Sequence, residues 1–161
     1  MPGPELTIRP ATEADIREFA LWRYEPPFDV YSISEPVDQA VAYFLRPTVG
    51  CHVIEDGEEL VGFMTVGSDA RVPGGDYSQS GLDIGLGVKP SLTGRGRGAA
   101  FVEAVLAFAR RTFDLRPLRV TIATGNQRAI RVWSGRGFVE TQRFDSPETV
   151  LGSSEFVVLE G

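Results

Sequence analysis

The sequence predicts an α/β sandwich around a mixed sheet. Strand-like runs and helical patterns follow each other in the order β-α-α-β-β-β-α-β-α-β-β. Within residues 82–123, an apolar run, a Gly-rich loop, an Ala-rich helix and a second apolar run are consecutive, which predicts a right-handed crossover between parallel strands. With 161 residues, 42% of them hydrophobic, a single domain over 1–161 can bury a full core.

The first half of the chain is expected to hold three strands and two helices. Thr12, followed by Glu13 and Asp15, has the pattern of a helix N-cap with acidic residues in the first turn. Asp56-Gly57 separates two apolar runs and predicts a tight hairpin turn. The expected elements are a strand around 6–8, helices over 12–22 and 36–45, and strands over 51–55 and 60–67.

The second half alternates strands with helices. Residues 99–113 repeat apolar side chains at helical spacing, and residues 118–123 are mostly β-branched or apolar. The expected elements are a strand over 82–88, helices over 99–113 and 126–135, a strand beginning at 137–138 and a last strand over 156–159.

The composition excludes several classes of protein. One cysteine and one histidine rule out a disulfide framework and a zinc cluster, so we expect no metal. No apolar run reaches the roughly 20 residues of a membrane span. The N-terminus lacks the basic and apolar regions of a signal peptide, so a cytoplasmic protein without membrane contact is expected.

The charges are distributed unevenly along the chain. Residues 89–136 carry ten of the 16 basic residues and two of the 22 acidic ones, which gives this span a charge of +8 and the remainder −14. The basic span suits a polyanionic ligand, whereas the acidic remainder argues against a nucleic-acid partner.

The basic span contains the Gly-rich loop, which predicts a phosphate site. Glycines allow positive φ, and a following helix N-terminus offers free N–H groups to an anion. A Walker loop is excluded because Ala99 and Ala100 follow Gly98 in place of Lys-Ser/Thr. Gly94, Gly96 and Ala99 fit a dinucleotide fingerprint formally, but the acid at the expected distance, Asp114, precedes the next strand.

A third motif accounts for more of the chain. Thr93-x-x-Gly96-x-Gly98 resembles the [Q/R]-x-x-G-x-[G/A] acetyl-CoA loop of the GNAT N-acetyltransferase superfamily. Residues 126–138, NQRAIRVWSGRGF, resemble its second signature, N-x-x-A-x-x-x-Y-x-x-x-G-F. The resemblance implies a three-layer α/β sandwich with a mixed, mostly antiparallel central sheet. It also implies an enzyme that transfers an acetyl group from acetyl-CoA directly to a primary amine.

The resemblance also implies a cofactor site. The amides of the loop would bind the pyrophosphate, the preceding strand would bind the pantetheine arm, and Asn126 would lie near the thioester. Gly85 and Gly87 alternate with apolar residues and leave one strand face bare, which would let a ligand approach closely. The expected cofactor-binding residues are Leu86, Gly87, Val88, Thr93, Gly94, Arg95, Gly96, Arg97, Gly98, Ala99 and Asn126.

The proton-handling groups depart from the family pattern. Thr93 replaces the Gln or Arg anchor, Trp133 stands where many members have a tyrosine acid, and Thr121 stands where several have a glutamate. An indole N–H donates a hydrogen bond but is no practical acid, so the catalytic role of Trp133 is doubtful. Asp83, in an apolar context that could raise its pKa, is the candidate base, with a surface acid as the alternative interpretation.

The acceptor is expected to meet an aromatic, acidic loop. Trp22, Tyr24 and Tyr31 are the candidate substrate-binding residues, and cation–π attraction would suit a small-molecule or peptide amine. The protein is expected to be a monomer or a homodimer. Two alternatives stay open: a non-catalytic acyl-CoA sensor, which the missing proton-handling groups favour, and a dinucleotide-binding module.

Overall fold

Seven strands form one sheet in the part of the chain that the computed structural model describes, residues 5–150 and 153–161. The strands are β1 (Leu6–Pro10), β2 (His52–Asp56), β3 (Glu59–Val66), β4 (Leu82–Val88), β5 (Leu118–Ala123), β6 (Val139–Val150) and β7 (Ser153–Glu160). Their order is β1-β2-β3-β4-β5-β7-β6, and β4 and β5 are parallel while the other pairs are antiparallel. The predicted parallel pairing of the strands on either side of the Gly-rich loop and helix is confirmed.

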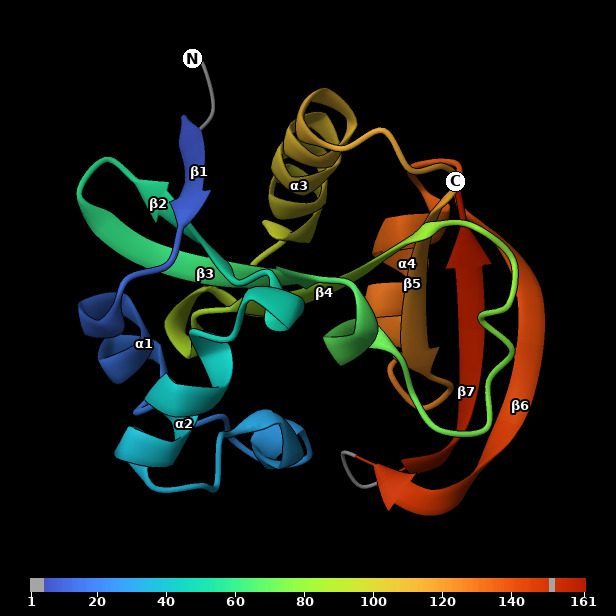
Figure 1. The fold of residues 1–161 in the computed structure, drawn as a ribbon, viewed down its shortest axis with the longest axis horizontal. Coiled ribbons are helices and arrows are strands. Elements are labelled where there is room, and N and C mark those ends of the chain that lie inside the picture. The colour runs from blue at the N-terminus through green and yellow to red at the C-terminus, as the bar shows by residue number, and fades with distance from the viewer. Residues whose placement is uncertain (1–4, 151–152) are drawn as a thin grey trace.

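Helices cover both faces of the sheet. They are α1 (Glu13–Phe19), α2 (Val37–Phe44), α3 (Gly98–Thr112) and α4 (Gln127–Ser134), with a 3₁₀ turn η1 at Phe28–Tyr31. Figure 1 shows α1 and α2 together on one side of β3, with α3 on the other. The helices that the structure describes are too short or too polar to span a lipid bilayer.

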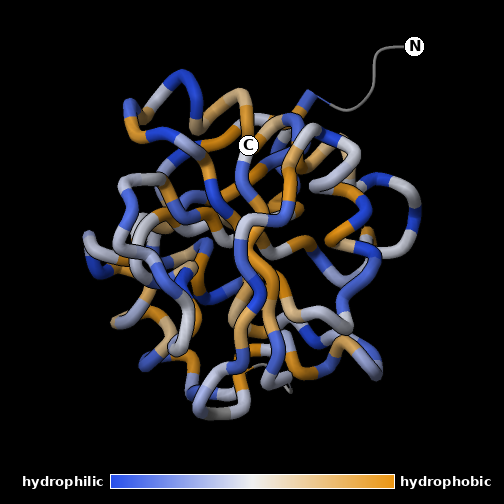
Figure 2. Tube along the Cα trace, turned by 90° about the vertical axis from the view of Figure 1, so that its right-hand side faces the viewer, coloured by the Kyte–Doolittle hydropathy of each residue, from blue (hydrophilic) through white to orange (hydrophobic). Residues whose placement is uncertain are grey.

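Two hydrophobic clusters fill the spaces between the layers. The larger one joins α3 and α4 to the sheet around Phe101, Val105 and Leu118, and the smaller one joins α1 and α2 to β2 and β3 around Ile16 and Phe19. In Figure 2 the hydrophobic residues run mainly along the interior strands, and hydrophilic residues predominate in the outer loops. The expected three-layer sandwich is therefore confirmed.

The structure changes one expected helix boundary and removes one of the open alternatives. The first helix ends at Phe19 instead of Trp22, because the chain turns and packs the Trp22 ring against Phe19 and Phe63. The sheet has a single parallel pair among the described strands, which excludes the parallel doubly wound sheet of a dinucleotide-binding module.

The strands β4 and β5 diverge like the arms of a fork. Their register includes Leu82 and Asp83 of β4 and stops there, whereas β4 stays paired with β3 as far as Val88. At the closed end, Asp83 and Arg119 are each 2% exposed and form a two-pronged ion pair, with both N···O distances at 2.9 Å. This pair therefore fixes the point from which the two strands separate.

The start of α1 has the predicted cap. The Asp15 N–H donates to the Thr12 hydroxyl, and the Thr12 N–H donates to the Asp15 carboxylate at 2.8 Å. Arg9 of β1 donates to both carboxylate oxygens, at 2.6 and 3.0 Å. These hydrogen bonds, with that of Arg9 the strongest, lower the pKa of Asp15 to about 2.

Replacing Asp15 with Asn removes the carboxylate that Arg9 contacts, and we expect the free energy of unfolding at pH 7 to fall by about 1–2 kcal/mol. The loss stays this small because Arg9 is partly exposed and solvent screens the contact. A carboxyl with a lowered pKa stabilises the fold above its unfolded pKa of about 3.9, and this contribution is lost as the pH falls towards its folded value. Urea unfolding at several pH values tests this. A difference between variant and wild type that stays constant down to pH 2 would contradict it.

Removing one partner of the buried pair should cost far more. Asp83→Ala leaves the Arg119 charge without its carboxylate, and we expect the free energy of unfolding to fall by about 3–5 kcal/mol. The double variant Asp83→Leu/Arg119→Met removes both charges and should recover most of this loss. Equilibrium unfolding in urea measures both. A loss below about 1 kcal/mol in Asp83→Ala would show that the pair does not stabilise the fork.

Candidate functional site

The outer edge of β4 faces the open fork. The Lys89 N–H donates to β3, and the Asp83 carbonyl accepts from the residue that follows β3. Because backbone groups alternate along an antiparallel strand, the polar groups of Ile84, Leu86 and Val88 point away from β3. In the described chain, the pairing of this edge with β5 ends at Asp83, and no other strand pairs with it beyond that residue. An extended ligand with amide groups can therefore pair with it as a further strand would.

The Gly-rich loop at the end of this edge forms an anion-binding turn. Gly94 and Gly96 have φ of +69° and +71°, and α3 begins directly after them. The side chain of its N-cap residue, Arg97, makes no capping hydrogen bond. The Thr93 hydroxyl donates to the Pro90 carbonyl at 2.8 Å, so it holds the turn. Alternating left-handed residues with uncapped N–H groups suit a bound phosphate.

Two basic residues flanking the turn contact acids of the β2–β3 hairpin. Lys89 lies 3.0 Å from Glu59, and Arg97 lies 3.5 Å from Asp56. The Arg97 guanidinium also lies over the Phe101 ring. The hairpin therefore holds one side of the loop through ion pairs that are partly open to solvent.

The segment between α1 and η1 crosses the open fork. The Tyr24 hydroxyl donates to the Val88 carbonyl at 2.6 Å, and burial raises the Tyr24 pKa to about 12, so this phenol keeps its proton. The Asn126 amide donates to the Tyr31 hydroxyl at 3.1 Å, and its oxygen caps α4 by accepting from Ala129. Tyr24, Tyr31, Val88 and Asn126, singled out separately in the sequence, therefore come together here.

The bare face expected on β4 is filled, which corrects that interpretation. A Cβ added at Gly87 would overlap the Phe63 ring, and one at Gly85 would lie 2.6 Å from the Thr65 hydroxyl. These two glycines make room for side chains of β3. A ligand can reach the edge of β4 but not this face. Trp22 packs against the same Phe63 and belongs mainly to the aromatic cluster.

Asp83 is poorly placed to act as the base. Its two oxygens accept from Arg119 at 2.9 Å each, and one of them also accepts from Arg71 at 2.8 Å. The hydrogen bond to Asp83 raises the pKa of Arg119. A general base needs a free lone pair within reach of the substrate proton, and both Asp83 oxygens are committed to the fold. The geometry therefore argues against Asp83 as the general base.

Trp133 and Thr121, two of the three positions that depart from the family pattern, have structural roles. Trp133 is 5% exposed and packs edge-on against Phe138, with ring centroids 5.0 Å apart, so it is a core residue. The Thr121 hydroxyl lies 2.9 Å from that of Tyr77, which also accepts from the Val72 N–H. Tyr77 thus lies over β5 just beyond the closed end of the fork.

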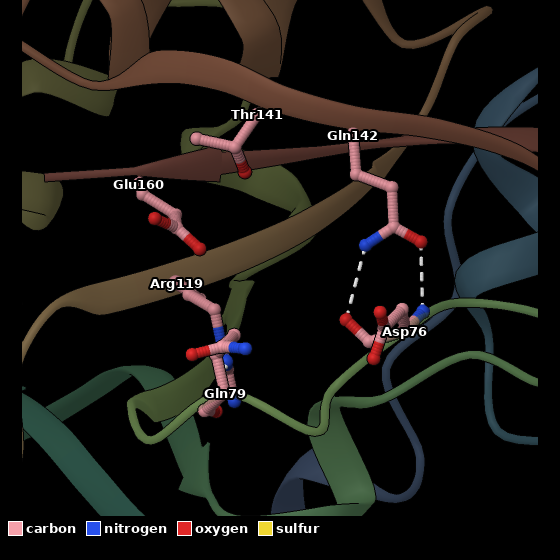
Figure 3. Close-up of a pocket in the computed structure, with 6 residues that line it drawn as sticks. All are labelled: Asp76, Gln79, Arg119, Thr141, Gln142 and Glu160. Atoms are coloured by element: carbon pink, nitrogen blue, oxygen red, sulfur yellow. Dashed lines mark hydrogen bonds between the residues drawn. The ribbon is translucent and has the colours of Figure 1, made fainter.

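A polar hollow of about 420 Å³ lies beside the closed end of the fork (Figure 3). Gln142 bridges it by two hydrogen bonds to the backbone of Asp76, and Arg119 is committed to Asp83 and the Gln79 carbonyl. Its lining residues are Asp76, Gln79, Arg119, Thr141, Gln142 and Glu160. None of these belongs to the Gly-rich loop. Within the described residues, no group of three or more His, Cys, Asp or Glu side chains is placed to hold a metal.

The sequence reasoning missed two residues at the open end. The guanidinium of Arg128, in the first turn of α4, lies 4.4 Å from the centroid of the Phe28 ring. One signal was available, because Arg128 follows Asn126 closely in the second signature and has no acid three or four residues away. Phe28 carried no comparable signal, since contacts between distant segments depend on the tertiary fold.

The sequence matches the model of the acetyltransferase (GNAT) family over residues 14–138. No curated protein sequence matches the chain. Solved structures resemble it over nearly its full length, at identities that show the fold alone.

Three of these structures illustrate the likeness. A chimera of Vibrio cholerae spermidine N-acetyltransferase and hSSAT is 17% identical, with 96% of this chain and 93% of that chain covered and a TM-score of 0.77. The V. cholerae enzyme in complex with CoA and spermine is also 17% identical, with 96% and 93% covered and a TM-score of 0.74. YncA of Salmonella typhimurium, a putative acetyltransferase with acetyl-CoA, is 20% identical, with 97% and 92% covered and a TM-score of 0.68.

The forked sheet, the anion-binding turn at the start of α3 and the asparagine at the start of α4 lie within the matched residues. The family model covers most of the chain. The chain therefore belongs to the GNAT acetyltransferase family, whose members are acetyl-CoA-dependent N-acetyltransferases.

Proposed function

We propose that this protein transfers the acetyl group of acetyl-CoA to a primary amine that enters beside the segment 22–31. One observation carries the proposal: a strand edge with no neighbouring strand beyond Asp83 is followed, after a 3₁₀ turn at Pro90–Leu92, by an anion-binding turn at the N-terminus of a 15-residue helix. Acetyl-CoA has matching chemistry, because an amide-bearing arm is joined to a pyrophosphate.

The cofactor site is proposed to have two parts. The N–H groups from Gly94 to Ala99 would bind the pyrophosphate, with Arg95 and Arg97 contributing positive charge. The outward N–H and C=O of Leu86 and the outward N–H of Val88 would pair with the pantetheine amides, while the Val88 carbonyl accepts from Tyr24. Gly87 directs its polar groups to β3 and would contribute by leaving room for Phe63.

The protein is proposed to assist the transfer through hydrogen-bond donors beside the thioester. Bound acetyl-CoA supplies a thioester, whose carbonyl carbon forms a C–N bond with the neutral amine while the C–S bond breaks. Backbone N–H groups at the outer edge of β4 are placed to polarise a carbonyl. Asn126 and Tyr31, already hydrogen-bonded to each other, can donate to groups in the open fork. The nitrogen loses one proton to solvent or to a second amine, and the CoA thiolate takes up one proton from solvent.

The acceptor is proposed to be a small cationic amine or a peptide N-terminus. Tyr24 and Tyr31 line the crossing segment, Trp22 lies at its start, and Glu25 and Asp29 within it are acidic. Aromatic faces and carboxylates together attract ammonium groups. The spermine in the V. cholerae structure is an amine of this kind, which supports testing polyamines first.

A second function is favoured by one observation. Trp133 and Thr121 stand at the two positions where members of the family often have catalytic side chains. Trp133 is buried in the core, and the Thr121 hydroxyl is hydrogen-bonded to that of Tyr77. A protein with these groups could bind acyl-CoA as a sensor without turning it over.

Release of free thiol from acetyl-CoA separates the two functions. We expect saturable release with at least one member of a panel of polyamines, amino-acid derivatives and short peptides. Binding of acetyl-CoA without release across the panel would favour the sensor. Failure of acetyl-CoA to bind would overturn both.

Gly96→Glu is expected to abolish acetyl-CoA binding. A Cβ at Gly96 meets nothing within 4 Å, so the new carboxylate would occupy the phosphate position and repel the ligand. Gly137→Glu is the matched control, because Gly137 also has positive φ and no neighbour within 4 Å of an added Cβ. Calorimetry should detect no binding to Gly96→Glu and affinity within roughly threefold of wild type for Gly137→Glu. Unchanged affinity in Gly96→Glu would contradict the cofactor site.

A further inference from the structure

Arg128 lies between the anion-binding turn and the segment that crosses the fork. Its guanidinium carbon is 4.4 Å from the centroid of the Phe28 ring in η1. Its Nη1 atom is 2.9 Å from the position that a Cβ on Gly94 would take. One side chain therefore touches the proposed phosphate site and the proposed acceptor segment.

The charge of Arg128 is available to an anion. Among the described side chains, no carboxylate lies within ion-pair distance of it, whereas Lys89 and Arg97 beside the same turn are paired with Glu59 and Asp56. A guanidinium that stacks on a ring uses its flat face and keeps its N–H donors in the plane of the group. Arg128 can therefore bind a phosphate oxygen and remain on Phe28.

The crossing segment contacts the proposed cofactor site at two more points. The Tyr24 hydroxyl donates to Val88 at the edge of β4, and Tyr31 accepts from Asn126 at the start of α4. Residues 24–31 therefore contact the strand, the asparagine and the arginine that surround the fork. A ligand that fixes any of these groups changes the freedom of the whole segment.

We propose that Arg128 binds a phosphate of the cofactor while stacked on Phe28, so that cofactor binding orders the acceptor segment 24–31. The inference rests on the proposed function, because it assigns a role within the same site. Coupling of this kind is reciprocal, so a segment held in place also strengthens cofactor binding. The ordered segment then presents Tyr24 and Tyr31 to the amine in a fixed arrangement.

The first test measures CoA binding by calorimetry. Arg128→Ala should weaken CoA binding by roughly tenfold or more, because charge-assisted hydrogen bonds to phosphate are lost. Arg131→Ala, an exposed arginine on the same helix, removes the same charge and should stay within roughly twofold of wild type. Dephospho-CoA identifies the phosphate: an equal loss with it indicates the pyrophosphate, and no loss indicates the 3′-phosphate. Arg128→Ala binding both ligands as wild type does would overturn the proposal.

The second test follows amide hydrogen exchange in a peptide covering 22–34, with and without saturating CoA. CoA should slow exchange there in the wild type. Arg128→Lys keeps the charge but loses the planar stack, and Phe28→Leu loses the aromatic face. Both should still bind CoA and lose this protection. Protection that persists in both variants, or is absent from the wild type, would overturn the coupling.

Failure of the inference is distinguishable from failure of the proposed function. A wild-type chain that does not bind CoA contradicts the function itself. A wild type that binds CoA, with an Arg128→Ala variant that binds equally well, contradicts the role of Arg128 alone. Thermal unfolding of each variant confirms that a loss of binding does not reflect a loss of folding.

Discussion

A strand inside a sheet is normally hydrogen-bonded on both edges, and β4 is bonded on both only as far as Asp83. Beyond that residue the chain has to satisfy one edge by other means, because unpaired backbone groups are costly when they are removed from water. Tyr24 satisfies one of them, the carbonyl of Val88. The other outward backbone groups of β4 beyond Asp83 are left available to a ligand. The point where β4 and β5 separate therefore determines where the site lies.

The two ends of the fork use charge in opposite ways. At the closed end, Asp83 and Arg119 are buried and hydrogen-bonded to each other, so their charges hold the two strands together. At the open end, positive charges remain near solvent, two of them loosely paired with the β2–β3 hairpin. A polyanion can displace loose pairs of this kind at little cost. The basic span 89–136 thus supplies both Arg119 of the buried ion pair and the partly exposed positive charges beside the Gly-rich loop.

The sequence was most informative where local patterns dictate structure. The capping residues of α1, the hairpin turn at Asp56-Gly57 and the β4–α3–β5 crossover could all be predicted because each depends on neighbouring residues. Asp83 shows why the site could not be predicted in full. An acid in an apolar run looks like a base with a raised pKa until its partner, 36 residues away, is known. Arg128 and Phe28 are separated by even more of the chain, and their contact depends on the path of the loop after α1.

The pairing of β3 with β4 has one further consequence. The Phe63 ring occupies the space that a side chain at position 87 would need, so Phe63 and Gly87 together fill one volume across two strands. Neither position can change in size without altering what the other must accommodate. Phe63 in turn stacks on Phe19, with centroids 4.2 Å apart, which carries the effect to α1. The absence of a side chain in β4 therefore sets how closely the first helix of the protein can approach the strand that borders the site.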